Sequence, residues 1–190
     1  MAKIGLTNFR YAILTESLDG SYSYGGALTP AKAISCSTEI TNNSAMLYAD
    51  DTLAESDMSF QSGTVTIGID KTDNQTMATL LGHTVDSNTD EIIRNANDTA
   101  PYVGLGRVIT EIVNGVYQYT VEILFKCKFS EPSQDNNTKG ESVEFSTYEL
   151  KGTVNTLADG NWSKAKTFST KAEAIAYIET EFGSDQDQII

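Results

Sequence analysis

The stretch YVGLGRVITEIVNGVYQYTVEILFKCKF, residues 102–129, decides the fold of this chain. Two runs rich in β-branched and aromatic residues flank the dipeptide Asn114-Gly115, which is typical of the two-residue type I′ turn of a β-hairpin. We therefore expect two long antiparallel strands. A two-residue turn also fixes the register, because every residue before the turn then has one partner after it.

The expected register sorts the side chains of this hairpin onto two faces. The first face is apolar almost throughout, and on it Gly106 lies opposite Ile123. Farther from the turn, Gly104 is expected opposite Phe125. Both glycines would then make room for the large side chains across the strand pair.

The second face of the hairpin changes character along its length. Near its middle Arg107 is expected opposite Glu122, so that opposite charges meet. Beyond that pair, Leu105 is expected opposite Leu124 and the surface becomes apolar. A half-apolar face needs a cover, which either a flanking helix or a neighbouring subunit can supply.

Strands are also predicted at residues 34–41, 63–70 and 143–154. Two short amphipathic helices complete the pattern, one after the capping box Thr72-x-x-Gln75 and one after Thr170-x-x-Glu173. The fold class expected is mainly β, a β-sandwich or curled sheet with one or two peripheral short helices and long projecting loops. Ile34, Cys36 and Ile40 are expected on one face of the first of the three predicted strands, and the second carries Val65, Ile67 and Ile69. The first helix is expected to carry Met77, Leu80 and Leu81 inward and to end at Gly82, and the second to place Ala174, Ile175, Ile178 and Phe182 along one stripe and to end at Gly183.

Length and composition favour one folded domain over residues 1–190. With 190 residues and 39% hydrophobic residues, the chain can bury one sizeable core. No apolar run approaches the roughly 18 residues of a membrane-spanning helix, and the N-terminus lacks a signal-peptide pattern. We therefore expect a protein of the cytoplasm, or of a particle assembled there. A net charge of −13 disfavours DNA binding, because phosphate contacts require clustered lysine and arginine.

The residue types that carry chemistry in enzymes are few and scattered. The single histidine, His83, cannot form a multi-histidine metal site. Cys36 and Cys127 each lie in a strand-like pattern, which predicts reduced thiols rather than a disulfide. The Gly-x-Gly at residues 104–106 belongs to the hairpin rather than to a phosphate-binding loop. We therefore expect no catalytic residue, no metal, no cofactor and no enzymatic activity.

The most acidic stretch is SAMLYADDTLAESDMSFQSG, residues 44–63. It lacks the alternating acids and the glycine of an EF-hand calcium loop, and its carboxylates cluster in one segment instead of facing each other across a cleft as in a glycosidase. A long connection carrying this much apolar material is typical of a contact segment. We interpret residues 42–62 as a loop arm, an extended hairpin that docks on another subunit. The contact residues expected are Tyr48, Asp50, Asp51, Leu53, Glu55, Asp57 and Phe60.

Two further segments are predicted to lie outside the packed strands. The polar stretch SEPSQDNNTKGES, residues 130–142, is long enough to project from the fold as a second contact loop. The C-terminal residues 184–190 are expected to form a loose tail.

Five segments carry a resemblance to a known family: KIGLTNFRYAIL at the start, ITNNSAMLYADDTLAESD in the arm, NDTAPYVGLGRV before the hairpin, KFSEPSQDNNTKGESVEFST after it and TKAEAIAYIE near the end. In this order, and over nearly the whole chain, the sequence resembles the major tail proteins, or tail tube proteins, of long-tailed phages and prophages of Gram-positive bacteria. The family has no catalytic motif to carry over.

The resemblance implies a single tail tube domain, a β-sandwich with a flanking helix. Its subunits would form hexameric rings that stack into the tube through which DNA leaves the capsid. The implied partners are other copies of the chain and the tail tip, tape-measure and tail-terminator proteins, with DNA passing unbound and no membrane involved. The implied place is the tail of the virion, after assembly in the host cytoplasm. An acidic wall suits such a channel, because it repels phosphate.

The residues alone leave a second function open. A β-sandwich of this kind can also be a module that binds a carbohydrate or a cell-surface ligand. Exposed aromatic side chains such as Tyr22, Tyr24 or Trp162 would then serve as stacking platforms, although packing inside the fold is the commoner role of such residues.

Overall fold

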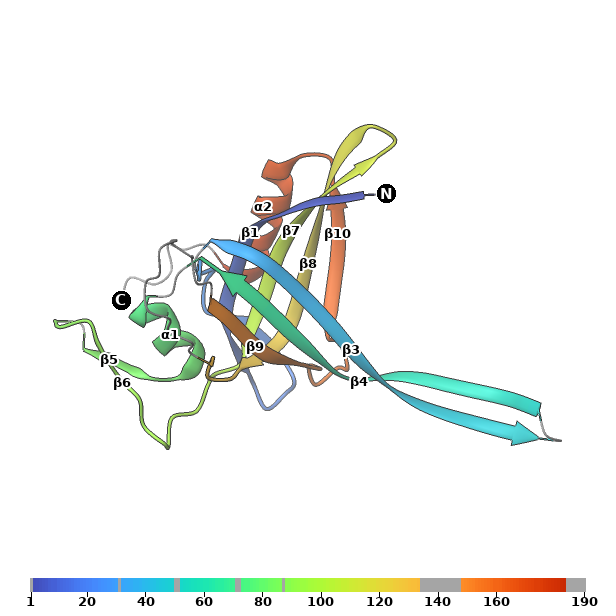
Figure 1. Cartoon of the computed structure of the whole chain (residues 1–190), viewed down its shortest axis with the longest axis horizontal. Helices are drawn as coiled ribbons and strands as arrows, with labels where there is room; N and C mark the ends of the chain where they lie inside the picture. The colour runs from blue at the N-terminus through green and yellow to red at the C-terminus, as the bar shows by residue number, and fades with distance from the viewer. Residues whose placement is uncertain are drawn as a thin grey trace, which may run out of the picture.

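The protein is a mainly β structure with two short helices, shown in Figure 1. This computed structural model describes residues 2–30, 32–49, 52–70, 73–86, 88–133 and 148–183, without the side chains of residues 2, 45–49 and 52–57. The elements are β1 (Ala2–Glu16), β2 (Tyr22–Tyr24), β3 (Ala33–Ala49), β4 (Thr52–Ile69), α1 (Asn74–Leu81), β5 (Thr84–Asp86), β6 (Glu91–Ile93), β7 (Val103–Val113), β8 (Val116–Phe129), β9 (Tyr148–Asn155), β10 (Ser163–Phe168) and α2 (Lys171–Phe182).

The β7–β8 hairpin has the predicted turn and lies in the middle of the main sheet. Asn114 and Gly115 both have positive φ, 51° and 81°, as a type I′ turn requires. The main sheet has the order β2-β1-β7-β8-β9-β4-β3, with β10 pairing with β8, and all the pairs are antiparallel. The predicted pairings of Arg107 with Glu122 and of Leu105 with Leu124 are confirmed.

Strand β8 turns one sheet into two layers. Its residues 119–124 pair with β10, whereas its residues 126–129 pair with β9. At the change of partner, the β7–β8 register shifts between Val103 and Leu105, because β8 carries an extra residue there. Bulges of this kind bend a strand and increase its twist. The β9-β4-β3 part of the sheet thus folds over the part containing β1 and β7.

This curling covers the second face of the hairpin from within the chain. Leu105 and Leu124 lie in one buried cluster with Ile67 of β4 and Leu150 of β9. Helix α1 closes the same cluster with Met77, Leu80 and Leu81. A flanking helix or a neighbouring subunit was considered from the sequence as the cover of this face. The main cover is neither of these, because it is the chain's own second layer.

Helix α2 covers the first face of the hairpin. Its buried residues Ala174, Ile178 and Phe182 pack in a second cluster with Val108 and Val121 of the two hairpin strands. The predicted capping box is present, with Thr170 and Glu173 each accepting from the other's backbone. For α1 the predicted N-cap was Thr72, one residue too early. The N-cap is Asp73, whose side chain accepts a hydrogen bond from the Thr76 N–H.

Gly104 and Gly106 make room for α2 and β2, not for the opposite strand. A Cβ on Gly106 would lie 2.9 Å from Cε2 of Phe182 and 3.1 Å from Cγ2 of Ile178. A Cβ on Gly104 would lie 2.5 Å from Cε1 of Tyr24. The predicted pairing of Gly104 with Phe125 is wrong, because the bulge in β8 changes the register before it reaches that pair.

The three other predicted strands differ from the expectation in extent, and the first of them also in the side that its residues face. Val65, Ile67 and Ile69 of β4 are buried. Ile34 is 57% exposed, because the β3–β4 register shifts between Ala33 and Ser35 and β3 is the last strand of its layer. The third predicted strand is described only from residue 148 onward, and its residues 143–147 lie outside the described ranges, as do residues 134–142 of the polar loop and the tail 184–190.

Replacing Gly106 by alanine is expected to lower the free energy of unfolding by about 1 to 3 kcal/mol, because the new methyl group collides with Phe182 in a packed interface. A thermal melt would show a fall of several degrees. Gly5→Ala is the control, since no heavy atom lies within 4 Å of a Cβ placed there. Equal melting temperatures for the two variants would contradict the packing of α2 against Gly106.

Candidate assembly surface

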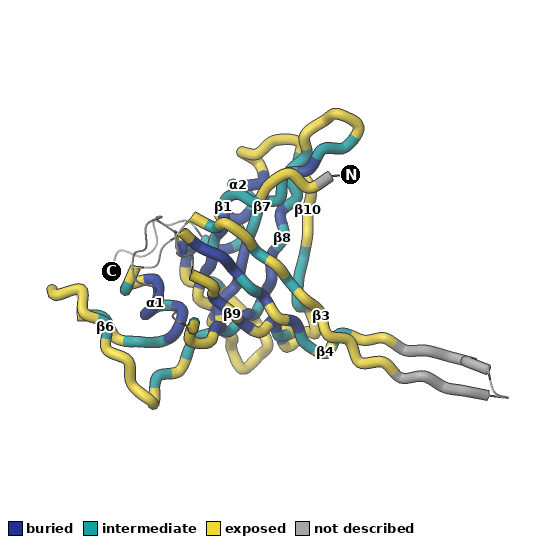
Figure 2. Tube along the Cα trace, viewed as in Figure 1, coloured by how far each residue is buried: buried dark blue, intermediate teal, exposed yellow. Residues whose placement is uncertain are grey.

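The outer part of the β3–β4 hairpin projects from the body as a two-stranded arm, as Figure 1 shows at its lower right. The arm comprises residues 42–49 and 52–62, because β4 pairs with β9 only from Gly63 to Ile69 and, among the described residues, the two strands farther out pair only with each other. Figure 2 shows the described part of the arm as exposed on both strands, apart from its base. Eight residues of β3 in extended conformation give the arm a length of roughly 26 Å.

The extended hairpin expected from the sequence is confirmed in its backbone, but it is not a loop. Cross-strand pairing continues from the body to Ala49 and Thr52, with shifts only between Thr41 and Asn42 and between Leu47 and Tyr48. The sequence lacks the alternation of a half-buried strand here, and the described side chains of the arm outside its base, residues 42–44 and 58–59, are exposed. A hairpin can form without that alternation, since pairing already set at its base is extended residue by residue.

The structure distributes the predicted contact residues along both strands of the arm. In the backbone register Tyr48 is the partner of Leu53. Glu55 pairs with Leu47, and Asp57 pairs with Ala45. Their side chains, and Asp50 and Asp51 as whole residues, lie outside what the structure describes. Their role in a subunit contact therefore remains a prediction.

Phe60, the last predicted contact residue, fixes the base of the arm to the body. Its ring stacks on Trp162, with centroids 4.9 Å apart and an angle of 6° between the planes. The carbonyl of Trp162 in turn accepts a hydrogen bond of 3.0 Å from the Phe125 N–H of β8. Phe60 thus acts within the subunit, whereas Met58, two residues farther out, is 67% exposed.

An arm with this composition is poorly stabilised by itself. A two-stranded hairpin without a core is at best marginally stable in water, and its unpaired edges are templates for further strands. The stretch between Lys32 and Lys71 contains no lysine or arginine, so none of the arm's carboxylates has a basic neighbour in its own hairpin. The arm is therefore both an unfinished sheet and a concentrated negative charge.

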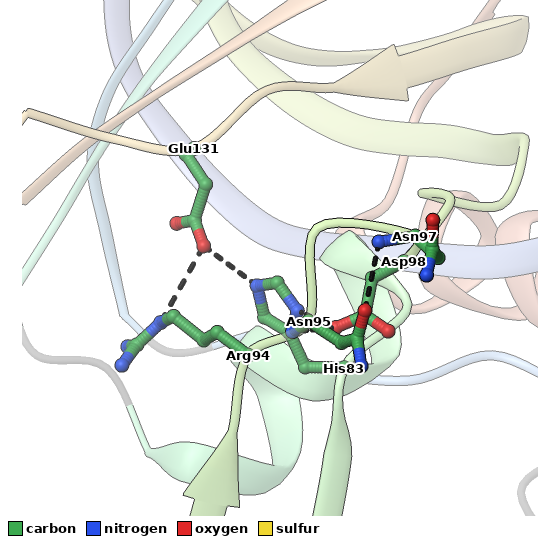
Figure 3. A network of polar contacts seen from close by, with 6 residues as sticks. All are labelled: His83, Arg94, Asn95, Asn97, Asp98 and Glu131. Carbon is green, nitrogen blue, oxygen red and sulfur yellow. Dashed lines mark hydrogen bonds and ion pairs between the residues drawn. The ribbon is translucent and has the colours of Figure 1, made fainter.

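A second polar group of residues surrounds His83, just after α1 (Figure 3). Its Nδ1 lies 2.7 Å from Oδ2 of Asp98, and its Nε2 lies 2.6 Å from Oε1 of Glu131. Nε of Arg94 lies 3.4 Å from the same oxygen of Glu131. The His83 side chain is only 7% exposed. The imidazole thus ties together three segments that are distant in sequence.

The surroundings of His83 do not form a metal site. The two carboxylates approach opposite sides of the ring, so they cannot converge with it on one ion. Among the described residues, no group of three or more potential ligands is placed to hold a metal. The backbone N–H of Asn95 and the His83 ring hold the pKa of Asp98 below its ordinary value, which suits a permanently ionised structural partner.

The two cysteines are free thiols, as the sequence predicted. Cys127 is fully buried, and burial raises the pKa of its thiol. Cys36 is half-buried, and its Sγ lies 2.7 Å from Nη1 of Arg107, yet desolvation still raises its thiol pKa. Raised pKa values leave both thiols protonated and poorly nucleophilic.

The aromatic residues considered as ligand platforms are mostly used in packing. Tyr24 lies edge-on to Phe182, with centroids 4.8 Å apart, and its hydroxyl donates to the Phe125 carbonyl. Trp162 is occupied by Phe60. Of these three residues only Tyr22 is exposed, and its ring still packs edge-on against Tyr24 and Phe125, which gives little support for its use as a carbohydrate platform.

The comparisons with known proteins give little beyond this geometry. No protein-family model matches the chain, and no curated protein matches its sequence. Among solved structures, the cryo-EM structure of the anti-feeding prophage cap, a tube-terminating cap, is similar with a TM-score of 0.47 and 8% identity, covering 84% of this chain and 88% of that one. A likeness of this strength carries no argument about function. None of the described helices is long and apolar enough to span a membrane.

Phe60→Ala is expected to loosen the arm without unfolding the body, because the stacked pair contributes about 0.5 to 1.5 kcal/mol beyond the area it buries. Amide exchange should become faster over residues 42–62 and stay unchanged in β7 and β8. Met58→Ala is the control on the same strand and should leave both rates as they are. Identical exchange in the two variants would show that the arm is not anchored through Phe60.

His83→Phe is expected to cost about 1 to 3 kcal/mol, because it removes the donor from carboxylates that face a nearly buried position. Glu131→Gln keeps an acceptor oxygen at a half-exposed position and should cost less than about 0.5 kcal/mol. Denaturant unfolding of the two variants checks this order. If His83→Phe lost less unfolding free energy than Glu131→Gln, the imidazole ring would not be what joins these segments.

Proposed function

We propose that the chain is a structural, non-enzymatic subunit of a phage tail, which assembles with copies of itself into stacked hexameric rings forming the tail tube. The observation that supports this most is the arm, whose two strands leave the body with no core to cover them. A monomer gains nothing from such an extension. A subunit that places it on a neighbour satisfies its free edges and buries its apolar side chains.

The resemblance of the sequence to tail tube proteins supports the same role. The described parts of the segments that carry it correspond to β1, the arm, the start of β7, the end of β8 and helix α2, while residues 134–147 of the fourth segment lie outside the described ranges. These segments therefore lie in several strands and in one helix of the fold, and not in a single local motif. Under this proposal the partners are other copies and the tail tip, tape-measure and tail-terminator proteins, and the protein belongs to the virion after assembly in the host cytoplasm.

The charge of the chain fits a conduit for DNA. A net charge of −13 per subunit is repeated in every ring, and part of it would face the lumen. At physiological ionic strength the screening length is about 8 Å, so such charges act near the wall and discourage lasting contact with phosphate. DNA would then pass without specific binding.

Removing the arm is expected to abolish assembly while leaving the fold intact. Ser44 and Met58 are register partners, so replacing residues 45–57 by Asn-Gly closes the hairpin with a two-residue turn. The shortened chain should melt within about 2 °C of the wild type, since no described core residue is removed. Electron microscopy and sedimentation at high protein concentration should find rings or tubes only for the full chain.

Amide exchange gives an independent check on the full chain. The arm should be better protected in the assembled protein than in the monomer, because the neighbour supplies partners for its edges. Rings formed as readily by the shortened chain, or equal protection of the arm in both states, would contradict the proposed function.

A further inference from the structure

One face of the body carries a cluster of lysines that stands out in so acidic a chain. Lys126 and Lys128 lie on β8, where Lys128 is the register partner of Thr153, and Lys151 lies two residues from Thr153 on β9. Their neighbours Cys127, Phe129 and Leu150 point into the core between the layers. Alternation along a strand therefore places all three lysines on the outer face of the sheet.

The ring of Tyr102 completes this lysine face, which consists of Lys126, Lys128, Lys151 and Tyr102. The Nζ atoms of Lys126 and Lys128 lie 4.5 Å and 5.3 Å from the ring centroid. Tyr102 is 38% exposed as a residue, so a partner can still reach it. Tyrosine is among the residues that most often carry binding energy at protein interfaces.

The lysine face has charge that the subunit itself does not neutralise. Lys126 forms an ion pair with Glu16. Within the described residues, neither Lys128 nor Lys151 has an ion-pair partner. Glu149 lies on the same face of β9, two residues before Lys151, and reduces the positive field without removing it.

We propose that the lysine face receives the acidic arm of a second copy of this chain. This inference rests on the proposed function, since it names the surface on which the arm docks. The chemistry is complementary: the arm segment carries Asp50, Asp51, Glu55 and Asp57 with no base, and the lysine face offers cations beside an aromatic ring. Opposite potentials of this kind speed the encounter of two surfaces and fix their orientation.

The arm of the same subunit does not reach this face. Its strands stay paired outward as far as Ala49 and Thr52, and Figure 1 shows them running away from β8 and β9. Bringing the acidic end back would require breaking that ladder. Contact between the two surfaces is therefore intermolecular.

A nucleic acid is the less suitable occupant of the lysine face. DNA-binding surfaces match a row of phosphates with many basic groups, whereas here three lysines stand beside Glu16 and Glu149 on a chain of net charge −13. The arm segment, which carries four carboxylates and no base, is opposite in charge to Lys128 and Lys151 of the lysine face, which have no ion-pair partner in the described part of the chain.

Charge reversal tests the inference. In the double variant Lys128→Glu with Lys151→Glu, assembly followed by light scattering at low ionic strength should be about tenfold slower. Combining it with Glu55→Lys and Asp57→Lys on the arm should restore most of the rate. The matched control for Lys151→Glu is Lys171→Glu, the same charge change on an exposed lysine of α2, which should assemble as the wild type does. Thermal melts establish that each variant is folded.

The outcomes separate this inference from the proposed function. A slow double variant that the reversed arm rescues supports the lysine face as the docking site. A double variant that assembles at the wild-type rate, while the chain shortened at residues 45–57 does not assemble, overturns the lysine face and leaves the proposed function standing. A double variant that assembles at the wild-type rate and differs from the wild type only in how much duplex DNA it binds also overturns the lysine face as the docking site. A wild-type chain that never assembles, even when seeded with preformed tails, contradicts the proposed function itself.

Discussion

The structure depends on the fact that the β7–β8 hairpin carries apolar side chains on both faces, over nearly the whole of one and over half of the other. A sheet with one apolar face can leave the other in water, but a hairpin with two must be covered twice. Helix α2 covers the face of Val108 and Val121, and the layer of β9, β4 and β3 covers the face of Leu105 and Leu124. The second cover requires the sheet to curl, and the change of partners along β8 is where it does so.

The elements whose side chains follow one simple period were predictable from the sequence. The hairpin turn, the alternation of Val65, Ile67 and Ile69 and the capping box of α2 each follow a local rule. Strand β1 was not predicted, because two register shifts interrupt its alternation. Strand β10 was not predicted either, because Lys164 and Lys166 make its sequence look polar. In the structure the ammonium groups of both lysines lie over aromatic rings.

The sequence predicted where the candidate site lies along the chain. It did not predict which residues contact the site in space. Length and composition pointed to the arm, and Phe60 was named, but its partner Trp162 lies about a hundred residues away. The partners of His83 are likewise 15 and 48 residues distant. The lysine face was hidden by one bulge: unbroken alternation from Leu124 would have turned Lys126 and Lys128 toward the core, and the extra residue in β8 turns them outward.

The continuity of β4 from the arm into the body has a mechanical consequence. A pull on the arm along its length is carried by the backbone of β4 directly to its ladder with β9, which spans Gly63 to Ile69. Force directed along paired strands loads their hydrogen bonds together instead of opening them one at a time. The arm is therefore attached to its subunit in shear, the geometry in which a ladder resists tension best.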